Sequence, residues 1–315
     1  MLRFLEKKPT LALEITPRVV RAAVLSRSGT QSSVLAVETV DLPEGVVEEE
    51  YAVPNILDFK VLADRLGDCL GRLSRFNARR AALSLPDGVF RIHILEFDEL
   101  PPRAADRERL LRWRLEKAAA FDMAGTVLRY RVFRREGGPH TLLACAAKAA
   151  VVSQYESLLT DLGVQPWSIG PSSFHAMDHY ATLLHEHPQS FAFAYIADDA
   201  ISAMVADREN IFFYRWKEVR RTAADDSRLR VIREISDSIH FYTHRDRAQQ
   251  SGADRLFLAG TAAGLDAVAE GVRSSLSIDV SVLPPMIGVA AAGDAAGDAA
   301  MPVVSAALLG AGGTV

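Results

Sequence analysis

Three segments near the start of the chain alternate between apolar and polar side chains and are rich in β-branched residues. They span residues 10–15, 19–26 and 33–40. A period of two predicts β-strands. Residues 57–76 change to a helical period, with leucines every three or four positions along one face. Residues 81–85 return to a short apolar run before Pro86, so the predicted order is β-β-β-α-β.

The next stretch, residues 90–165, predicts a separate small α+β unit. Its strands are expected at residues 90–97, 126–133 and 141–147, and its helices at residues 104–120 and 149–162. Gly163 follows the second helix and Pro166 lies just beyond it, which is a common way for a helix to end. A strand over residues 167–169 and a helix over residues 172–185 lead out of the unit.

The second half of the chain repeats the element order of the first. Its strands are expected at residues 191–196, 201–206, 211–215, 255–258 and 279–283, and its helices at residues 229–245 and 265–276. Because both halves show the order β-β-β-α-β-α, we predict an α/β protein with the duplicated, two-lobe actin-like (ribonuclease-H-like) fold. The N-terminal lobe is expected over residues 1–190, with a small α+β subdomain inserted at about 90–165, and a reduced C-terminal lobe over residues 191–315. Residues 288–300 predict a loop rich in Ala, Gly and Asp, and residues 302–310 predict a short closing helix.

Composition and charge narrow the classes of function. The chain has 315 residues and a formal net charge of −4, which argues against nucleic acid as a partner because phosphate neutralisation requires a basic surface. Cys69 and Cys145 lie far apart and form no CxxC motif, which favours a reducing compartment. No run of about 20 apolar residues is available to span a bilayer, and the N-terminus lacks the apolar core of a secretion signal. We therefore expect a cytoplasmic protein whose association with a membrane is indirect.

Several local motifs resemble the PilM family of type IV pilus assembly proteins. Ser84-Leu85-Pro86 precedes a predicted strand and Glu99-Leu100-Pro101 follows it. A helix with the sequence RLLRWRLEKAAAFDM comes next, where the family has a similar Trp–Glu–Lys helix that ends in Pro-Phe. A strand that contains Tyr, a strand that ends in Ala-Ala-Lys and the helix exit Leu162-Gly163-Val164-Gln165-Pro166 complete the pattern. The resemblance covers almost the whole chain and is weakest at both ends.

The resemblance implies a degenerate member of the actin-like, FtsA-like superfamily, with the inserted subdomain displaced relative to its place in actin. It implies a protein that is peripheral at the cytoplasmic face of the inner membrane. The partner that it implies is a PilN-like inner-membrane protein, bound through its short N-terminal cytoplasmic peptide, and related proteins serve type II secretion platforms. On this basis we predict a scaffold without enzymatic activity, and we leave self-association open.

The first phosphate loop departs from the pattern of actin-like ATPases. In such loops an acidic residue faces hydrated Mg²⁺, and a glycine lets backbone N–H groups approach the phosphates. The family pattern is Asp-x-Gly. Here Glu14 keeps the acid, Thr16 replaces the glycine, and Pro17 removes an N–H donor.

The second and third loops are altered as well. Tyr195 and Ala197 replace the acid and the glycine of the second loop, with Asp198 in the adjoining turn. The third loop keeps Gly260, followed by Thr261, where the family has two glycines. The vestigial nucleotide-binding candidates are therefore Glu14, Thr16, Asp198, Gly260 and Thr261. Each lost hydrogen bond is worth about 1–3 kcal/mol, so we predict that nucleotide binding is lost; ordinary turn chemistry is the simpler interpretation of these residues.

Two enzymatic alternatives stay open at this point. One is an active actin-like ATPase that binds ATP and Mg²⁺ through unusual residues; otherwise no cofactor is expected. The other is a sugar-kinase-like enzyme of the same superfold, which is disfavoured because such kinases need a catalytic Asp in a well-formed second loop. The segment between Arg215 and Leu229 is also short for the small subdomain that usually closes over a nucleotide.

The expected partner site is the groove between the first lobe and the inserted subdomain. Its wall is predicted from Phe90, Ile92 and Ile94 on one strand. Arg112 and Trp113 are added from the helix that follows, because exposed Trp and Arg are frequent interface anchors. The basic side chains of that helix indicate either a solvated face with i,i+4 ion pairs or a basic ridge that faces acidic lipid headgroups or a partner's acidic tail.

Two other groups of polar residues are interpreted without a function. His175 and His179, like His240 and His244, are four residues apart on predicted helices, a spacing that can hold a metal. No third ligand is evident, so we expect exposed helix histidines and no metal site. The three glutamates at residues 48–50 predict a solvated loop.

Overall fold

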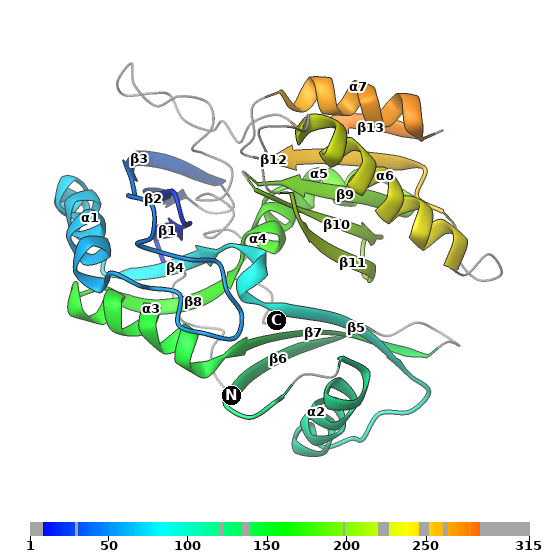
Figure 1. Ribbon diagram of the computed structural model, residues 1–315, viewed down its shortest axis with the longest axis horizontal. Coiled ribbons are helices and arrows are strands. Elements are labelled where there is room, and N and C mark those ends of the chain that lie inside the picture. Colours follow the sequence, from blue (N-terminus) through cyan, green and yellow to red (C-terminus); the bar gives the residue numbers. More distant parts are fainter. Residues whose placement is uncertain are drawn as a thin grey trace.

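The computed structural model describes residues 9–28, 31–119, 122–133, 139–197, 199–219, 227–245, 252–260, 264–276 and 278–283. Two lobes lie side by side, and a small subdomain lies below them in the view of Figure 1. The loop expected over residues 288–300 and the closing helix expected over residues 302–310 fall outside the described residues.

The first lobe is built on a five-stranded mixed sheet. Its strands are β1 (Leu11–Ile15), β2 (Val19–Ser28), β3 (Gln31–Asp41), β4 (Arg80–Leu85) and β8 (Gln165–Pro171), in the spatial order β3-β2-β1-β4-β8. The first three form an antiparallel meander, and β4 and β8 run parallel to β1. Helices α1 (Phe59–Arg72) and α3 (Ala149–Asp161) cover one face, where Leu62 and Tyr155 join the core.

The second lobe repeats this topology. Its strands are β9 (Phe191–Ile196), β10 (Ala200–Ala206), β11 (Ile211–Glu218), β12 (Arg255–Gly260) and β13 (Asp279–Val282), in the order β11-β10-β9-β12-β13. The first three are again antiparallel and the last two parallel to β9. Helices α6 (Ser227–Arg245) and α7 (Leu265–Ser275) cover one face, and α4 (Ser172–His179) and α5 (Ala181–Glu186) cover the other. The prediction of a duplicated, two-lobe α/β fold is confirmed.

The inserted subdomain is a three-stranded antiparallel sheet with one helix. Its strands are β5 (Arg91–Phe97), β7 (His140–Lys148) and β6 (Thr126–Phe133), in that spatial order, and its helix is α2 (Ala104–Ala119). One sheet face packs on α2 through Leu111 and Leu115. The opposite face contributes Ile92, Ile94 and Leu143 to a core shared with the second lobe. The subdomain sheet therefore lies between α2 on one face and the second lobe on the other.

Several boundaries differ from the sequence-based expectation; the helix expected over residues 57–76, for example, is α1 over Phe59–Arg72, followed by a 3₁₀ turn at Ser74–Phe76. Helix α3, expected as part of the inserted unit, packs on the first-lobe sheet, because its buried face joins the core formed by β1, β4 and α1. The helix expected over residues 172–185 is divided at Tyr180, whose side chain is buried. Strand β11 continues to Glu218 because it stays paired with β10 along its length. Gly163, at φ +72°, ends α3 as expected.

Candidate functional site

The candidate site is a cleft between the two lobes, at the end of the sheets where the phosphate loops were expected. It is formed by the β1–β2 turn, the β9–β10 turn, the short 3₁₀ helix Asp87–Val89 and the start of α4. The charged residues that line it are Glu14, Arg18, Arg21, Glu49, Asp87 and Asp199, together with apolar and hydroxyl side chains that include Tyr195, Ser202 and Trp216. The acids thus outnumber the cations, which opposes the binding of a polyanion such as a nucleotide.

The first loop satisfies its own backbone donors. The Thr16 hydroxyl accepts hydrogen bonds from the N–H groups of Arg18 (3.2 Å) and Val19 (3.1 Å), and the Thr16 N–H donates to the Val19 carbonyl at 3.0 Å. These are the amides that a phosphate loop would direct at its ligand. Threonine in the glycine position therefore does more than add a Cβ, because its side chain occupies the donors.

Glu14 is engaged by an arginine from the same hairpin. The two residues face each other across β1 and β2, and Nη1 of Arg21 donates to Oε2 of Glu14 at 2.5 Å. Both side chains are buried. A carboxylate in a buried charge pair is already neutralised and hydrogen-bonded, so the acid retained from the first loop is committed to the fold.

The second loop is tied to the first by an ion pair across the cleft. Nη2 of Arg18 donates to Oδ2 of Asp199 at 2.6 Å. Ala197 N–H donates to the Ala200 carbonyl at 2.9 Å, which closes the β9–β10 turn on itself. Tyr195, in the position of the second acid, is buried in the second-lobe core. Asp198 lies outside the described residues.

Gly260 is required by strand packing. It is the last residue of β12 and lies opposite Ile196 in the parallel pair with β9. A Cβ at this position would collide with the Ile196 carbonyl oxygen, and backbone cannot yield as a flexible side chain can. The close contact between strands therefore explains why glycine is kept at this position. Neither nucleotide binding nor turn chemistry is needed to explain it. Thr261 lies outside the described residues.

Asp87 is the main polar junction between the lobes, and sequence reasoning missed it. At the start of α4 its carboxylate accepts hydrogen bonds from the Ser172 hydroxyl (3.2 Å), the Ser173 N–H (3.0 Å) and the Ser173 hydroxyl. From the second lobe it accepts hydrogen bonds from the Ser202 hydroxyl (2.7 Å) and the Tyr214 hydroxyl (2.9 Å). The only sequence signal is its place directly after the strand end Ser84-Leu85-Pro86. We refer to these five residues as the Asp87 network.

Burial and the neighbouring carboxylate of Asp87 raise the pKa of the Tyr214 hydroxyl well above its ordinary value. The phenol therefore remains a neutral donor at physiological pH. A carboxylate that receives this many donors is fully used and has no lone pair directed at a substrate. The Asp87 network is thus a connection between lobes and not a general base.

Glu49 corrects the expectation of a solvated loop. Its neighbours Glu48 and Glu50 are exposed, but Glu49 turns inward, lines the cleft and accepts a hydrogen bond from the Gly88 N–H at 2.8 Å. Burial, with smaller contributions from Asp87 and other carboxylates, raises the pKa of Glu49 to about 7, although the Gly88 N–H opposes the shift. Three glutamates in a row gave no signal for which one faces inward.

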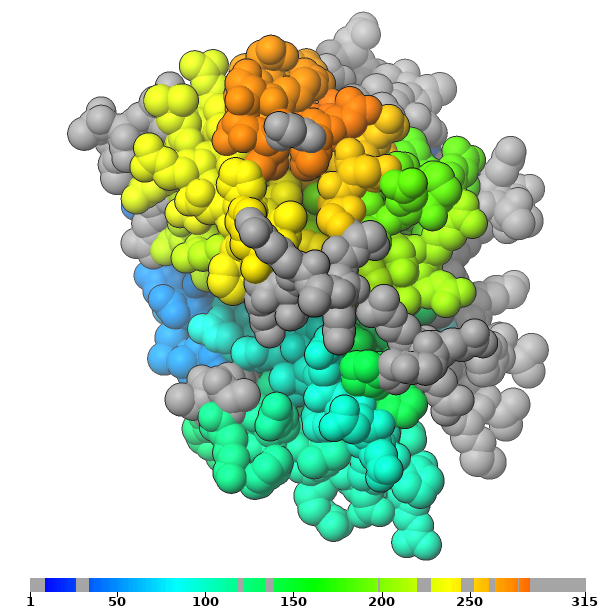
Figure 2. All heavy atoms as spheres, turned by 90° about the vertical axis from the view of Figure 1, so that its right-hand side faces the viewer, coloured from blue at the N-terminus to red at the C-terminus, as the bar shows by residue number. Residues whose placement is uncertain are grey.

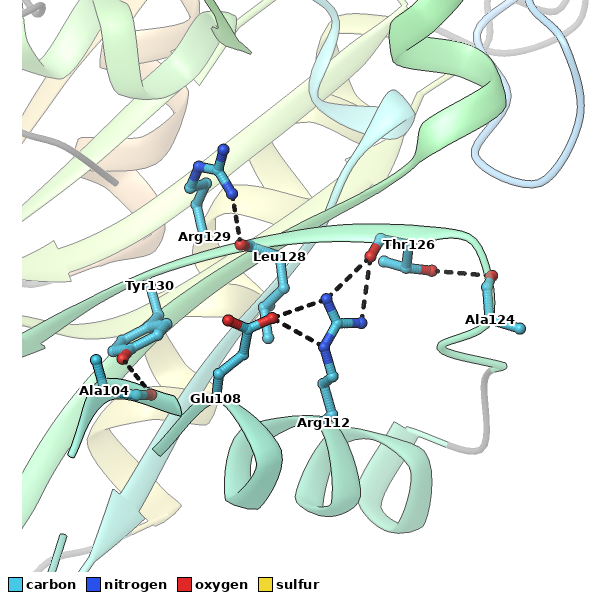
Figure 3. Close-up of polar contacts among 8 residues, drawn as sticks. All are labelled: Ala104, Glu108, Arg112, Ala124, Thr126, Leu128, Arg129 and Tyr130. Carbon is cyan, nitrogen blue, oxygen red and sulfur yellow. Dashed lines mark hydrogen bonds and ion pairs between the residues drawn. The ribbon is translucent and has the colours of Figure 1, made fainter. Parts of the chain in front are cut away.

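The predicted partner residues fall into two groups. Phe90 is only 6% exposed and belongs to the first-lobe core, and Ile92 and Ile94 are partly buried against the core of the second lobe. Trp113, by contrast, is 48% exposed. Arg112 binds within the subdomain: it donates to Glu108 and to the Thr126 carbonyl, which fastens α2 to β6 (Figure 3).

The histidine expectation is wrong for the first pair. His175 and His179 are partly buried, and burial lowers the pKa of each to about 4. Nδ1 of His175 lies 3.2 Å from the Ser84 hydroxyl, and its ring packs over Gly170. His240 and His244 lie beside each other on α6 with 5.9 Å between ring centroids. Among the described residues, no group of three or more His, Cys, Asp or Glu side chains is placed to hold a metal.

The chain was compared with protein-family models, curated proteins and solved structures, and only the solved structures gave matches. Neither the protein-family models nor the curated proteins contain a match to the sequence. A chain of the solved PilM–PilN type IV pilus biogenesis complex is similar over 97% of this chain and 98% of its own length, with a TM-score of 0.77 and 17% identity. A protein of actin-like ATPase fold and unknown function from Bacteroides thetaiotaomicron covers 90% of this chain and 95% of its own length, with a TM-score of 0.53 and 11% identity.

No helix among the described residues is long and apolar enough to cross a membrane.

The two similar structures indicate the fold of this chain. Identity is low in both cases, but the similarity to the PilM–PilN complex extends over both lobes and the insertion. The chain therefore has a two-lobe actin-like fold of the kind seen in the PilM–PilN type IV pilus biogenesis complex, as its local motifs predicted.

Proposed function

We propose that this protein is a cytoplasmic scaffold of the inner-membrane platform of a type IV pilus or a related secretion system. It binds the N-terminal cytoplasmic peptide of a PilN-like membrane protein, and it does so without nucleotide. The observation that carries the proposal is the similarity over nearly the full length of both chains to a structure of the PilM–PilN complex. The saturated cleft supports the second part, because its donors and charges are paired within the protein.

The surface best suited to the peptide is the boundary between the first lobe and the inserted subdomain. The first-lobe segment that precedes α1 reaches the subdomain there: the Arg91 guanidinium lies 4.3 Å from the centre of the Tyr51 ring. Gln154 on α3 fixes the same segment by accepting hydrogen bonds from the N–H groups of Asn55 and Ile56. The segment nevertheless leaves Val53 and Leu57 more than half exposed, at 52% and 55%. Two exposed aliphatic side chains on a fixed segment are a suitable anchor for an extended peptide.

Introduction of negative charge at this apolar pair is expected to weaken peptide binding. The double variant Val53→Glu/Leu57→Glu should weaken the affinity for the cytoplasmic peptide of a PilN-like membrane protein by at least about tenfold. The reason is that apolar anchors that become buried on binding carry most of the energy of an interface. Fluorescence anisotropy with a labelled peptide measures it. The control is Leu35→Glu, which changes an exposed leucine on β3. Equal affinities for the double variant and the native protein would place the peptide elsewhere, and no binding to any such peptide would refute the scaffold role.

Mg-ATP is expected not to bind. Calorimetric titration at up to about millimolar nucleotide should give no saturable heat, because the loss of several donors at about 1–3 kcal/mol each moves a micromolar affinity beyond that range. The variant Thr16→Gly should behave in the same way, since the Arg18–Asp199 pair still crosses the cleft and the Arg21–Glu14 pair still engages the acid of the first loop. A micromolar dissociation constant for the native protein would instead support the alternative, an active actin-like ATP-binding protein of the same assembly.

A further inference from the structure

Charge is distributed unevenly between the inserted subdomain and the rest of the protein. Residues 91–148 hold 12 of the 36 Lys and Arg residues and 8 of the 40 Asp and Glu residues, so this stretch carries +4 while the remainder carries −8, for a total of −4. The subdomain is therefore a basic pole on an acidic protein. Such a separation orients a protein in an electric field even when the net charge is unfavourable.

The basic side chains of α2 divide between its two faces. On the inner side, Leu111 and Leu115 are fully buried against the sheet. Arg112 donates hydrogen bonds there to Glu108 and to the Thr126 carbonyl (Figure 3). The exposed side presents Arg103, Arg109, Trp113, Arg114 and Lys117. Arg107 likewise donates to the Pro101 and Pro102 carbonyls. Two arginines thus attach the helix to its surroundings, and four cations remain exposed on its outer face and at the residue just before it.

Trp113 lies among these cations. Its side chain is 48% exposed, and the Lys117 ammonium group lies 4.5 Å from the centre of its ring. The Arg109 side chain is 82% exposed and has a 3.5 Å contact with Asp106, so its pairing is weak. Asp106 and Glu116 are the acids on this side of the helix, so the cations remain in excess.

The exposed face of α2 is also at one extreme of the molecule. In Figure 1 the helix lies on the side of the subdomain sheet away from both lobes, and in Figure 2 the same region forms the lower end of the particle. A helix in this place presents a convex surface that a flat partner can reach without contact with the lobes.

We propose that the outer face of α2 binds anionic lipid headgroups. The cations Arg103, Arg109, Arg114 and Lys117 would contact the phosphates, and Trp113 would enter the interfacial region that indole rings favour. A lipid surface fits better than an acidic peptide because the charges are spread over a convex helix face around one aromatic side chain, whereas peptide recognition uses a groove or a free strand edge. The inference does not depend on the proposed peptide site, which involves different residues, so either can fail alone.

Vesicle sedimentation tests the proposal with the full-length protein and no partner. Phosphatidylcholine vesicles that contain 30% phosphatidylglycerol (about the anionic content that gives a strong surface potential) should retain the protein at 50 mM salt. Vesicles of phosphatidylcholine alone should not. Binding should fall at about 500 mM salt, where charges are screened within a few ångströms. Equal binding to both kinds of vesicle, or to neither, would overturn the proposal.

Matched charge reversals locate the surface. Each basic residue at an anionic membrane contributes about fivefold to partitioning, so Arg109→Glu/Arg114→Glu should lower it by at least about 25-fold, and Trp113→Ala should lower it severalfold. Lys60→Glu/Arg65→Glu on α1 makes the same change of charge at exposed positions of the first lobe and should retain binding. If the two double variants behave alike, α2 is not the contact. If vesicles fail but polyglutamate binds and Arg109→Glu/Arg114→Glu abolishes that, the face serves an acidic protein instead.

Discussion

Replacement of Asp87 by Ala should lower the free energy of unfolding by about 3–5 kcal/mol, because it removes the buried carboxylate that accepts every hydrogen bond of the Asp87 network and leaves several buried donors unsatisfied. The substitution leaves the hydroxyl groups of Ser172, Ser173, Ser202 and Tyr214 without their acceptor. Unsatisfied buried donors cost about 1–3 kcal/mol each when water cannot reach them. Urea unfolding monitored by circular dichroism measures the change.

A double-mutant cycle distinguishes the Asp87 network from general loss of packing. Tyr214→Phe alone should cost about 1 kcal/mol, but the same substitution should cost clearly less in the Asp87→Ala background, because the hydrogen bond to Asp87 is already absent and only the contact with Ser202 remains. The coupling energy between the two sites should therefore be a large part of the cost of the single Tyr214 variant. Additive effects would show that Asp87 acts independently of the second lobe. Asp64→Ala, at an exposed site on α1, is the control and should change stability by less than about 0.5 kcal/mol.

Glu49→Gln should stabilise the protein at pH 8 by about 2–3 kcal/mol and leave it nearly unchanged at pH 4. Burial raises the folded-state pKa of Glu49 from 4.5 to about 7, and one unit is worth about 1.4 kcal/mol. Between these two values the folded state binds the proton and the unfolded state has released it. Stability contributed by Glu49 is thus present below pH 4.5 and lost as the pH rises to 7. Glutamine retains an acceptor for the Gly88 N–H without the charge.

The difference in unfolding free energy between the native protein and the variant, measured in urea at pH 4, 6 and 8, isolates this one group. Other titrations are common to both proteins and cancel. Glu48→Gln is the matched control, since Glu48 is the exposed neighbour and its substitution should change stability by less than about 0.5 kcal/mol. A constant difference for Glu49→Gln across the range would show that its carboxyl is solvated after all.

The two predictions describe one property of the cleft. Its carboxylates, Glu14, Glu49, Asp87 and Asp199, are each held by a donor from the protein, two of them by arginines. Arg18 and Asp199 come from different lobes, as do Asp87 and its partners Ser202 and Tyr214 on β10 and β11. Contacts of this kind join the lobes without a bridging nucleotide. We therefore expect the relative position of the lobes to be insensitive to ATP, in keeping with a scaffold.

Local signals in the sequence were sufficient for the architecture. Alternation, helical periodicity and stop signals depend on near neighbours along the chain, and they predicted both meanders, the insertion and the end of α3 at Gly163. The same signals failed where distant segments compete for a surface. Helix α3 has an apolar face that suits either the inserted sheet or the first lobe, and only packing against β8 and α1 assigned it to the lobe.

The candidate site could be predicted from the sequence less completely than the fold. The residue types at Thr16, Tyr195 and Ala197 already indicated loops that lack the usual glycines and one acid, because a phosphate loop needs particular residues at adjacent positions. The sequence could not show that Thr16 captures the loop amides or that Gly260 faces the Ile196 carbonyl. These relations depend on side-chain direction and on contacts between strands, which a linear pattern does not contain.

By itself, then, the sequence determined a duplicated α/β chain with a small insertion and altered phosphate loops, since each of these features is encoded within a few neighbouring residues. Only the tertiary structure decided that Glu49 and Asp87 meet in the cleft, that Phe90 is buried while Trp113 is exposed, and that arginines complete the charge pairs. The physical reason is that burial and charge pairing are set by which distant segments come together, and the packing of the two lobes brings together residues 181 positions apart, as Arg18 and Asp199 show.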